Sequence, residues 1–224
     1  MQYIAISQYR WPKFPSSWLC NYEKRLIPIS IYFKYDPMKR YMVYLFNDKF
    51  KPEDAREILK KARNLAVDSN VILRDVRVAT DFLEIDVSIP DDAVLPEILS
   101  SLGQIGRVIE YQQIEDKYME KKDSIDYARI LFNSQKYWRA HEVLEAIWKR
   151  SEDAEKQILN AIILISAAFV HYQKNENNVC ISILERALQK LDKIDGIYYE
   201  IDLDRIKAHI SKNIRTGIVE RTTI

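Results

Sequence analysis

The stretch YWRAHEVLEAIW, residues 137–148, combines one imidazole, two carboxylates and two indoles. Residues three and four apart lie on the same side of a helix, so Trp138, His141, Glu145 and Trp148 share one face. His141 and Glu145 are then one turn apart, beside large aromatic side chains that exclude water. A carboxylate that is partly removed from water needs a partner, and His141 is the nearest candidate for Glu145.

The helical pattern also predicts the surroundings of this pair. Tyr137 and Leu144 mark the apolar centre of the helix, whereas Glu142 points further outward. On the next helix, one stripe runs from Asn160 to His171 and contains two alanines, which permit close helix approach. We therefore expect the imidazole of His171 to face the pair.

Three kinds of role are open to these residues. His141, Glu145 and His171 would supply two imidazoles and a carboxylate, a ligand set typical of non-haem iron and of zinc sites that catalyse hydrolysis. Without a metal, Glu145 would act as a base whose pKa is raised by the tryptophans. In the third role, His141 and Glu145 form a buried hydrogen-bonded clasp that fixes helix packing. We favour the clasp, which needs no cofactor, because paired polar residues in a core most often serve structure.

Three segments of the sequence are similar to a known family. They read FN-x-x-x-Y-x-x-AHE-x-x-E-x-x-W (132–148), AA-x-VH (167–171) and LERAL-x-KL (184–191). In this order they resemble domain-of-unknown-function family 309, over about residues 124–195. The resemblance implies a compact helical bundle of uncharacterised activity. It carries over His141, Glu145 and Trp148 as motif residues, with Glu142 and His171 as matching neighbours.

The sequence departs from the family pattern at three positions. Gln135 and Asn175 stand where the family tends to have glycine in turns, and Leu164 stands where it has glutamine. Asparagine can adopt the left-handed backbone that glycine provides. Leu164 removes a polar partner from the centre of the bundle, which weighs against an intact catalytic site.

From residue 117 to residue 224, the apolar spacing predicts an all-helical bundle. Ser124, Ser134 and Ser151 each stand where a helix is expected to begin, and serine is a good helix cap. The third helix is apolar all round in its second half, which is typical of a central helix. The predicted helices span residues 124–133, 134–150, 151–175, 177–194 and 202–215.

Residues 40–116 predict a different domain, in which strands and helices alternate in the order β-α-β-β-α-β. The segment FLEIDVSIP alternates cleanly, with apolar residues on one face and Glu84, Asp86 and Ser88 on the other. This order is the ferredoxin-like plan, so we predict an α+β chain in which a ferredoxin-like domain precedes the helical bundle. The predicted elements span residues 40–47, 51–66, 71–80, 82–90, 95–103 and 107–114.

The strand at residues 40–47 is apolar on both faces, which is usual where both faces are covered. The alternative is that Met42, Tyr44 and Phe46 form an aromatic platform for RNA bases. We favour the covered strand, because Glu84 and Asp86 on the neighbouring strand would face the phosphates.

Residues 1–39 are predicted to form an N-terminal arm that interleaves basic and aromatic residues. Arg10, Trp11, Lys13 and Trp18 are candidates for binding single-stranded nucleic acid or a nucleotide, since aromatic rings stack on bases and cations meet phosphate. A net charge of only +1 weighs against this role. The alternative is an arm that buries its aromatic residues against the rest of the chain.

The composition is that of an ordinary globular protein. Hydrophobic residues make up 47% and charged residues 30% of the 224 residues. The two cysteines, Cys20 and Cys180, match no metal or redox spacing, and the start of the chain lacks the pattern of a signal peptide. The longest apolar run, residues 161–170, is too short to span a bilayer. We therefore predict a cytoplasmic structural or interaction module with a protein partner or a second copy, and no membrane association.

Overall fold

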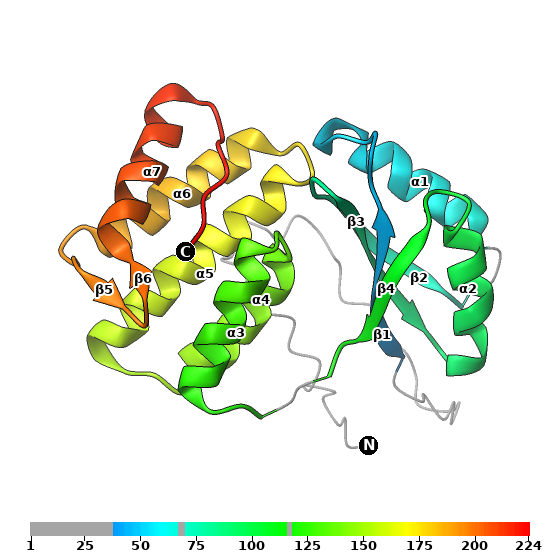
Figure 1. The fold of residues 1–224 in the computed structure, drawn as a ribbon, viewed down its shortest axis with the longest axis horizontal. Coiled ribbons are helices and arrows are strands. Elements are labelled where there is room, and N and C mark those ends of the chain that lie inside the picture. The colour runs from blue at the N-terminus through cyan, green and yellow to red at the C-terminus, as the bar shows by residue number, and fades with distance from the viewer. Residues whose placement is uncertain (1–37, 67–69, 116–117) are drawn as a thin grey trace, which may run out of the picture. The chain divides into compact units, whose positions relative to one another are not determined.

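The computed structural model describes residues 38–66, 70–115 and 118–224, which belong to one compact unit, Asp36–Ile224 (Figure 1). A mixed α/β part with a four-stranded antiparallel sheet comes first, and a helical part follows. Nearly all of the predicted arm, including its candidate nucleic-acid residues, lies outside the described residues. No helix in the described ranges has the length and apolar character to cross a membrane.

The sheet is antiparallel and has the strand order β2-β3-β1-β4. Helix α1 lies between the first two strands in the chain, and α2 lies between the last two. Along the chain the elements are β1 Lys39–Phe46, α1 Ala55–Leu65, β2 Ile72–Val78, β3 Phe82–Ile89, α2 Leu95–Leu102 and β4 Val108–Gln113. Single-turn 3-10 segments, Pro52–Asp54 and Asp92–Val94, lead into α1 and α2, and Asp54 accepts a hydrogen bond from the backbone of Lys51.

The two faces of the sheet differ in chemistry. One face carries the apolar residues of all three long strands and packs against α1 and α2, as Figure 1 shows. The opposite face is buried as well, but it is polar: Met42, Tyr44, Arg77, Glu84 and Asp86 are almost inaccessible to solvent. Both faces of β1 are therefore covered over most of its length, as predicted; Phe46, at its end, is exposed.

The outer edge of β2 is closed at two points by other parts of the chain. The backbone N–H of Val78 donates to the carbonyl of Gln173, which follows α5, at 3.0 Å. Near the other end of the strand, the guanidinium of Arg63 donates to the carbonyl of Leu73 through two nitrogens, at 3.1 and 3.0 Å. Thr80, just beyond β2, is also contacted by the helical part: its backbone N–H donates to the Gln135 side chain at 3.1 Å.

Five helices form the second part, with a small hairpin before the last one. Helix α5 packs against both α4 and α6, and its residues from Leu159 to Phe169 contribute most of its buried side chains. Phe132, Tyr137 and Phe169 form an aromatic cluster at the centre of this core. The elements are α3 Lys121–Asn133, α4 Tyr137–Trp148, α5 Asp153–Tyr172, α6 Asn177–Leu191, β5 Ile197–Tyr198, β6 Ile201–Asp202 and α7 Leu203–Thr216.

The turns correct one prediction and explain a departure from the family pattern. None of the three serines is a helix N-cap: α3 begins at Lys121, before Ser124; Ser134 is the C-cap of α3; and Ser151 precedes α5 by two residues. The hydroxyls of Ser124 and Ser151 donate to carbonyls four residues earlier instead. Gln135 and Asn175 have φ values of 61° and 60°, the left-handed conformation that a glycine would adopt without strain.

Candidate functional site

Helix α4 presents the motif residues along one partly buried side. Tyr137 and Leu144 are buried in the core, and the ring of Tyr137 stacks on Phe169 with centroids 5.0 Å apart. The side chains of His141 and Glu145 are 13% and 18% exposed. Both groups are therefore largely removed from water, although neither is fully enclosed.

Three ionisable groups meet on this helix. One ligand atom each from His141, Glu142 and Glu145 lies within 4.8 Å of the other two. The ion pairs differ from the expected clasp: His141 Nδ1 lies 3.4 Å from Glu142 Oε1, and Glu145 pairs with Lys149 at 3.1 Å. Glu142, predicted to point outward, is thus the nearest carboxylate to the imidazole.

The environment of Glu142 favours its charged form. Burial by itself raises the pKa of this carboxyl, but the hydrogen bond and charge of His141 and the positive charges of Arg40 and Arg139 outweigh it. The net result is a pKa below the ordinary value of a glutamate. Arg40 belongs to β1, so the sheet takes part in setting the charge state of a motif residue.

Trp138 brings the sheet and α4 together. Its ring lies 4.3 Å from the guanidinium carbon of Arg40 and 5.5 Å from that of Arg77. Arg40 also donates to Asp86 at 2.9 Å, and Arg77 pairs with Glu84 inside the polar face of the sheet. Two arginines that neutralise buried acids therefore also contact the face of one indole ring.

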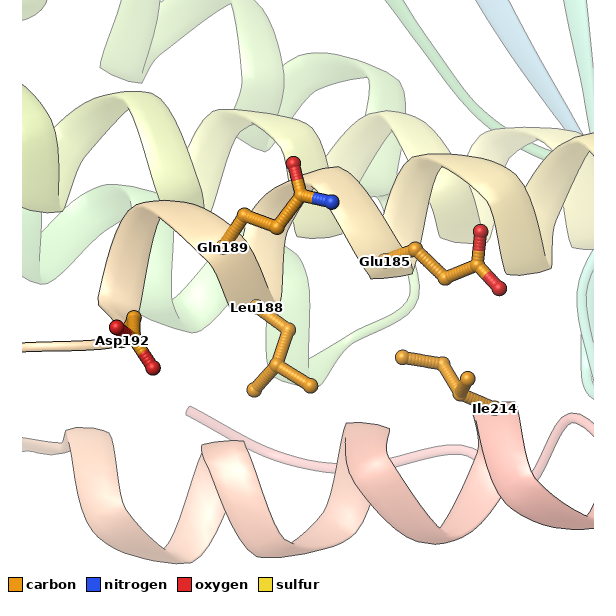
Figure 2. A pocket seen from close by; sticks show the side chains of 5 residues that line it. All are labelled: Glu185, Leu188, Gln189, Asp192 and Ile214. Carbon is orange, nitrogen blue, oxygen red and sulfur yellow. The ribbon is translucent and has the colours of Figure 1, made fainter.

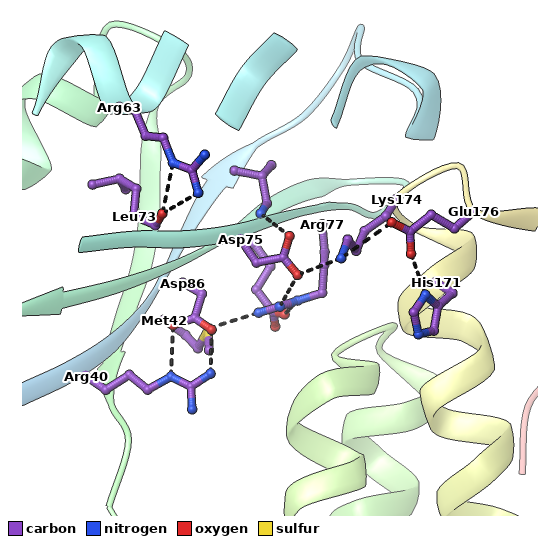
Figure 3. A network of polar contacts seen from close by, with 12 residues as sticks. Arg40, Met42, Arg63, Leu73, Asp75, Arg77, Asp86, His171, Lys174 and Glu176 are labelled. Carbon is purple, nitrogen blue, oxygen red and sulfur yellow. Dashed lines mark hydrogen bonds and ion pairs between the residues drawn. The ribbon is translucent and has the colours of Figure 1, made fainter. Parts of the chain in front are cut away.

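His171 lies at the end of α5 in a second polar network, drawn in Figure 3. Its Nδ1 is hydrogen-bonded to Glu176, which also lies 3.7 Å from the ammonium of Lys174. Lys174 in turn pairs with Asp75 of β2 at 3.2 Å, and Asp75 lies 3.4 Å from Arg77. The network thus connects His171 with the polar face of the sheet, whereas the compact group on α4 does not include His171.

Burial dominates the titration of His171. Desolvation lowers the pKa of the imidazole, and the hydrogen bond and charge of Glu176 offset only part of that effect. The pKa is therefore below the ordinary value of histidine, and the ring is neutral at neutral pH.

The remaining predicted site residues have less defined surroundings. The Trp148 indole lies 5.0 Å from the ammonium of Lys156, and its Nε1 is buried without a hydrogen-bond partner. Asn160 is partly buried on α5. Arg10, Trp11, Lys13 and Trp18 lie outside the described residues, and nucleic-acid binding through them stays a prediction.

Several residues that shape the site do not stand out in the sequence. Arg40 and Arg77 come from strands that the apolar pattern identified, yet nothing in that pattern pairs them with Trp138. The clearest available signal was the charge on the polar faces: Arg77 lies directly opposite Glu84 in the sheet register. Because unpaired charges are rarely buried, opposite charges at facing positions indicate a buried pair.

Comparison with known proteins agrees with the resemblance in the helical part. A search of curated proteins found no match to the chain. A family model does match residues 125–182, a segment that begins in α3, contains all of α4 and α5 and ends within α6. That segment, which holds both histidines of the predicted site, matches the family described as Domain of unknown function (DUF309).

Proposed function

We propose that the protein is a structural or interaction module in which the motif face of α4 holds the helical part to the sheet. The observation that carries this proposal is the contact of the Trp138 ring with the guanidinium groups of Arg40 and Arg77. A cation–π contact contributes about 1 kcal/mol where it is partly exposed, as at Arg40, and about 2 kcal/mol where it is desolvated, as at Arg77. On this proposal the main role of the motif residues is to pack α4 against its neighbours, and no catalytic role is needed to explain them.

We also propose a fold and residue bounds for each of the two parts. The chain order β-α-β-β-α-β and the sheet order β2-β3-β1-β4 support a ferredoxin-like domain at residues 40–116, followed by a helical domain at 117–224. A cytoplasmic location is supported by Cys180, which is buried and forms no disulfide.

A double-mutant cycle on Trp138 and Arg40 tests the structural role. Trp138→Leu, Arg40→Met and the double variant are unfolded with urea, and we expect a coupling free energy of about 1 kcal/mol between the two sites. The matched cycle uses Trp148→Leu with Arg40→Met, because the ring of Trp148 contacts Lys156 of α5. Equal coupling in both cycles, or none at Trp138, contradicts the proposal.

We infer divalent-metal binding on α4 as a second candidate function. It is supported by the clustering of His141, Glu142 and Glu145 within 4.8 Å, since one imidazole and two carboxylates suit zinc or manganese. This ligand set replaces His171 of the predicted set with Glu142. A metal held by these three side chains would keep a position for water and would supply the chemistry that activates water for hydrolysis.

Calorimetric titration with Zn²⁺ and with Mn²⁺ tests this second candidate. We expect His141→Ala and Glu142→Gln to weaken binding at least tenfold, on the order of the loss of one ligand. Glu57→Gln, an exposed glutamate on α1, is the control and should leave affinity unchanged. An equal loss in His171→Gln would favour the ligand set predicted from the sequence, and no heat with either metal would rule the site out.

A further inference from the structure

A groove lies between α6 and α7 on the helical part. It has a volume of about 430 Å³. Its lining residues are Glu185, Leu188, Gln189, Asp192 and Ile214, four of them from α6 and its C-terminal cap and one from α7 (Figure 2). None of these five takes part in the polar networks of α4 or the sheet, so the proposed roles of the motif do not account for them.

The groove combines an apolar floor with an acidic rim. Figure 2 shows the Leu188 side chain pointing from α6 toward Ile214 on α7, while Glu185 and Asp192 lie on either side of Leu188 along α6. The two carboxylates are about two helical turns apart, roughly 10 Å along the axis. Both are exposed, neither has an ion-pair partner within the described ranges, and no basic residue lines the groove.

We propose that this groove binds a cationic amphipathic helix of a partner protein. An apolar side chain of that helix would cover Leu188 and Ile214, and Lys or Arg residues about two turns apart would pair with Glu185 and Asp192. Helices recognised in this way present anchors at helical spacing along one face. The inference extends the proposed interaction role by naming the chemistry of the partner, but it uses none of the α4 residues.

The charge of the groove lining favours a cationic helix over other kinds of occupant. An acidic rim repels nucleic-acid phosphates and anionic lipid headgroups. A small diamine would gain only exposed ion pairs, each contributing well under about 1 kcal/mol. A helix also buries apolar area against Leu188 and Ile214, and each Å² so buried contributes about 25 cal/mol.

A charge-swap experiment tests the proposal on the full-length protein. The probe is a fluorescein-labelled amphipathic helical peptide with a central leucine and a lysine about one turn to each side; its twin carries glutamates instead of lysines. Fluorescence polarisation should show that wild type binds the lysine peptide at least tenfold more tightly than the glutamate peptide. In Glu185→Lys/Asp192→Lys this preference should reverse; both positions are exposed, so we expect the fold to be retained.

The controls separate this inference from the role proposed for α4. Glu57→Lys/Glu97→Lys makes the same change in net charge at exposed positions of α1 and α2 and should keep the wild-type preference. Lack of binding by wild type, or a preference that the groove variant does not change, overturns the inference. The inference is also overturned if light scattering shows a wild-type dimer and a monomeric groove variant, because the groove would then bind a second copy of the chain. The Trp138 coupling is untouched by each of these outcomes.

Discussion

At the scale of single residues, the polar face of the sheet holds charges that are stable only in pairs. Arg77 and Glu84 are each 1% exposed, and they are joined across neighbouring strands. The pKa of Arg77 is raised: burial lowers it, but the charges of Glu84, Asp75 and Asp86 outweigh burial. A buried pair adds little net stability, but removal of one partner leaves the other charge uncompensated.

The Arg77–Glu84 pair therefore predicts an asymmetric mutational response. We expect Glu84→Gln to lower the free energy of unfolding by about 3 kcal/mol, because the guanidinium loses its main counter-charge. Arg77→Met/Glu84→Leu should be less destabilising than the single change, since both members of the pair are removed and the buried Asp86 keeps Arg40 as its partner. Urea unfolding at neutral pH measures both. A double variant that is less stable than Glu84→Gln would contradict this account.

His171 predicts how stability responds to acid. Its pKa is lowered by burial in the folded protein, whereas the unfolded chain titrates at about 6.5. Below that value the unfolded chain binds a proton that the folded protein does not, so folding becomes less favourable as pH falls. Stability at pH 7.5 should exceed that at pH 5.5, and His171→Gln should reduce this difference. Denaturant midpoints across the range measure the effect, and a variant with the wild-type slope would contradict it.

At the scale of elements, periodicity predicts the strands and long helices well. The alternating segment predicted at 82–90 is β3, Phe82–Ile89, and the helix predicted at 51–66 is α1, Ala55–Leu65, with its 3-10 turn. Helix starts were predicted less well, because a serine hydroxyl donates to a preceding carbonyl as readily as it caps. The short hairpin of β5 and β6 was missed, since each strand has only two residues.

The partners of the site residues were the least predictable part. Helical spacing indicates that His141 and Glu145 share a face, but the side-chain torsions decide whether the imidazole meets Glu145 or Glu142. The contact of Trp138 with Arg40 joins residues far apart in the chain, and no local pattern encodes it. The left-handed turns were better signalled: the family tends to have glycine at both positions, and both residues have positive φ.

The turn at Asn175 gives a prediction for backbone strain. Asn175→Gly should match or exceed wild-type stability, because glycine adopts the observed φ of 60° freely. Asn175→Ala should cost about 1 kcal/mol, since alanine lacks the local hydrogen bonding that favours asparagine there. Thermal unfolding compares the two. In Gln135→Gly the gain should be smaller, because the Gln135 side chain also accepts hydrogen bonds from Thr80.

At the scale of the whole unit, contacts between the two parts are numerous and chemically varied. Lys136, just before α4, pairs with Glu110 of β4 at 2.8 Å and lies 4.1 Å from the ring of Tyr44. Lys174 pairs with Asp75, and Val78 donates to Gln173. Contacts that involve backbone, ion pairs and aromatic rings are lost together when either part unfolds.

These contacts predict cooperative unfolding of the sheet and the helices. Tryptophan fluorescence and far-ultraviolet circular dichroism should give the same urea midpoint, as a two-state transition requires. Trp138→Leu/Lys174→Ala removes one contact from each of two places and should separate the midpoints. Two resolved transitions in wild type would show that the parts fold independently.

The closure of β2 has a consequence for the solubility of the protein. A strand at the rim of a sheet offers unsatisfied peptide groups to any passing chain, and that template drives aggregation and amyloid-like growth. Here the carbonyl of Gln173 accepts a hydrogen bond from the amide of Val78, and the guanidinium of Arg63 donates to the carbonyl of Leu73. One main-chain group and one side chain of the molecule itself thus cover these two positions, and we expect β2 to resist pairing with strands of other chains when the protein is concentrated.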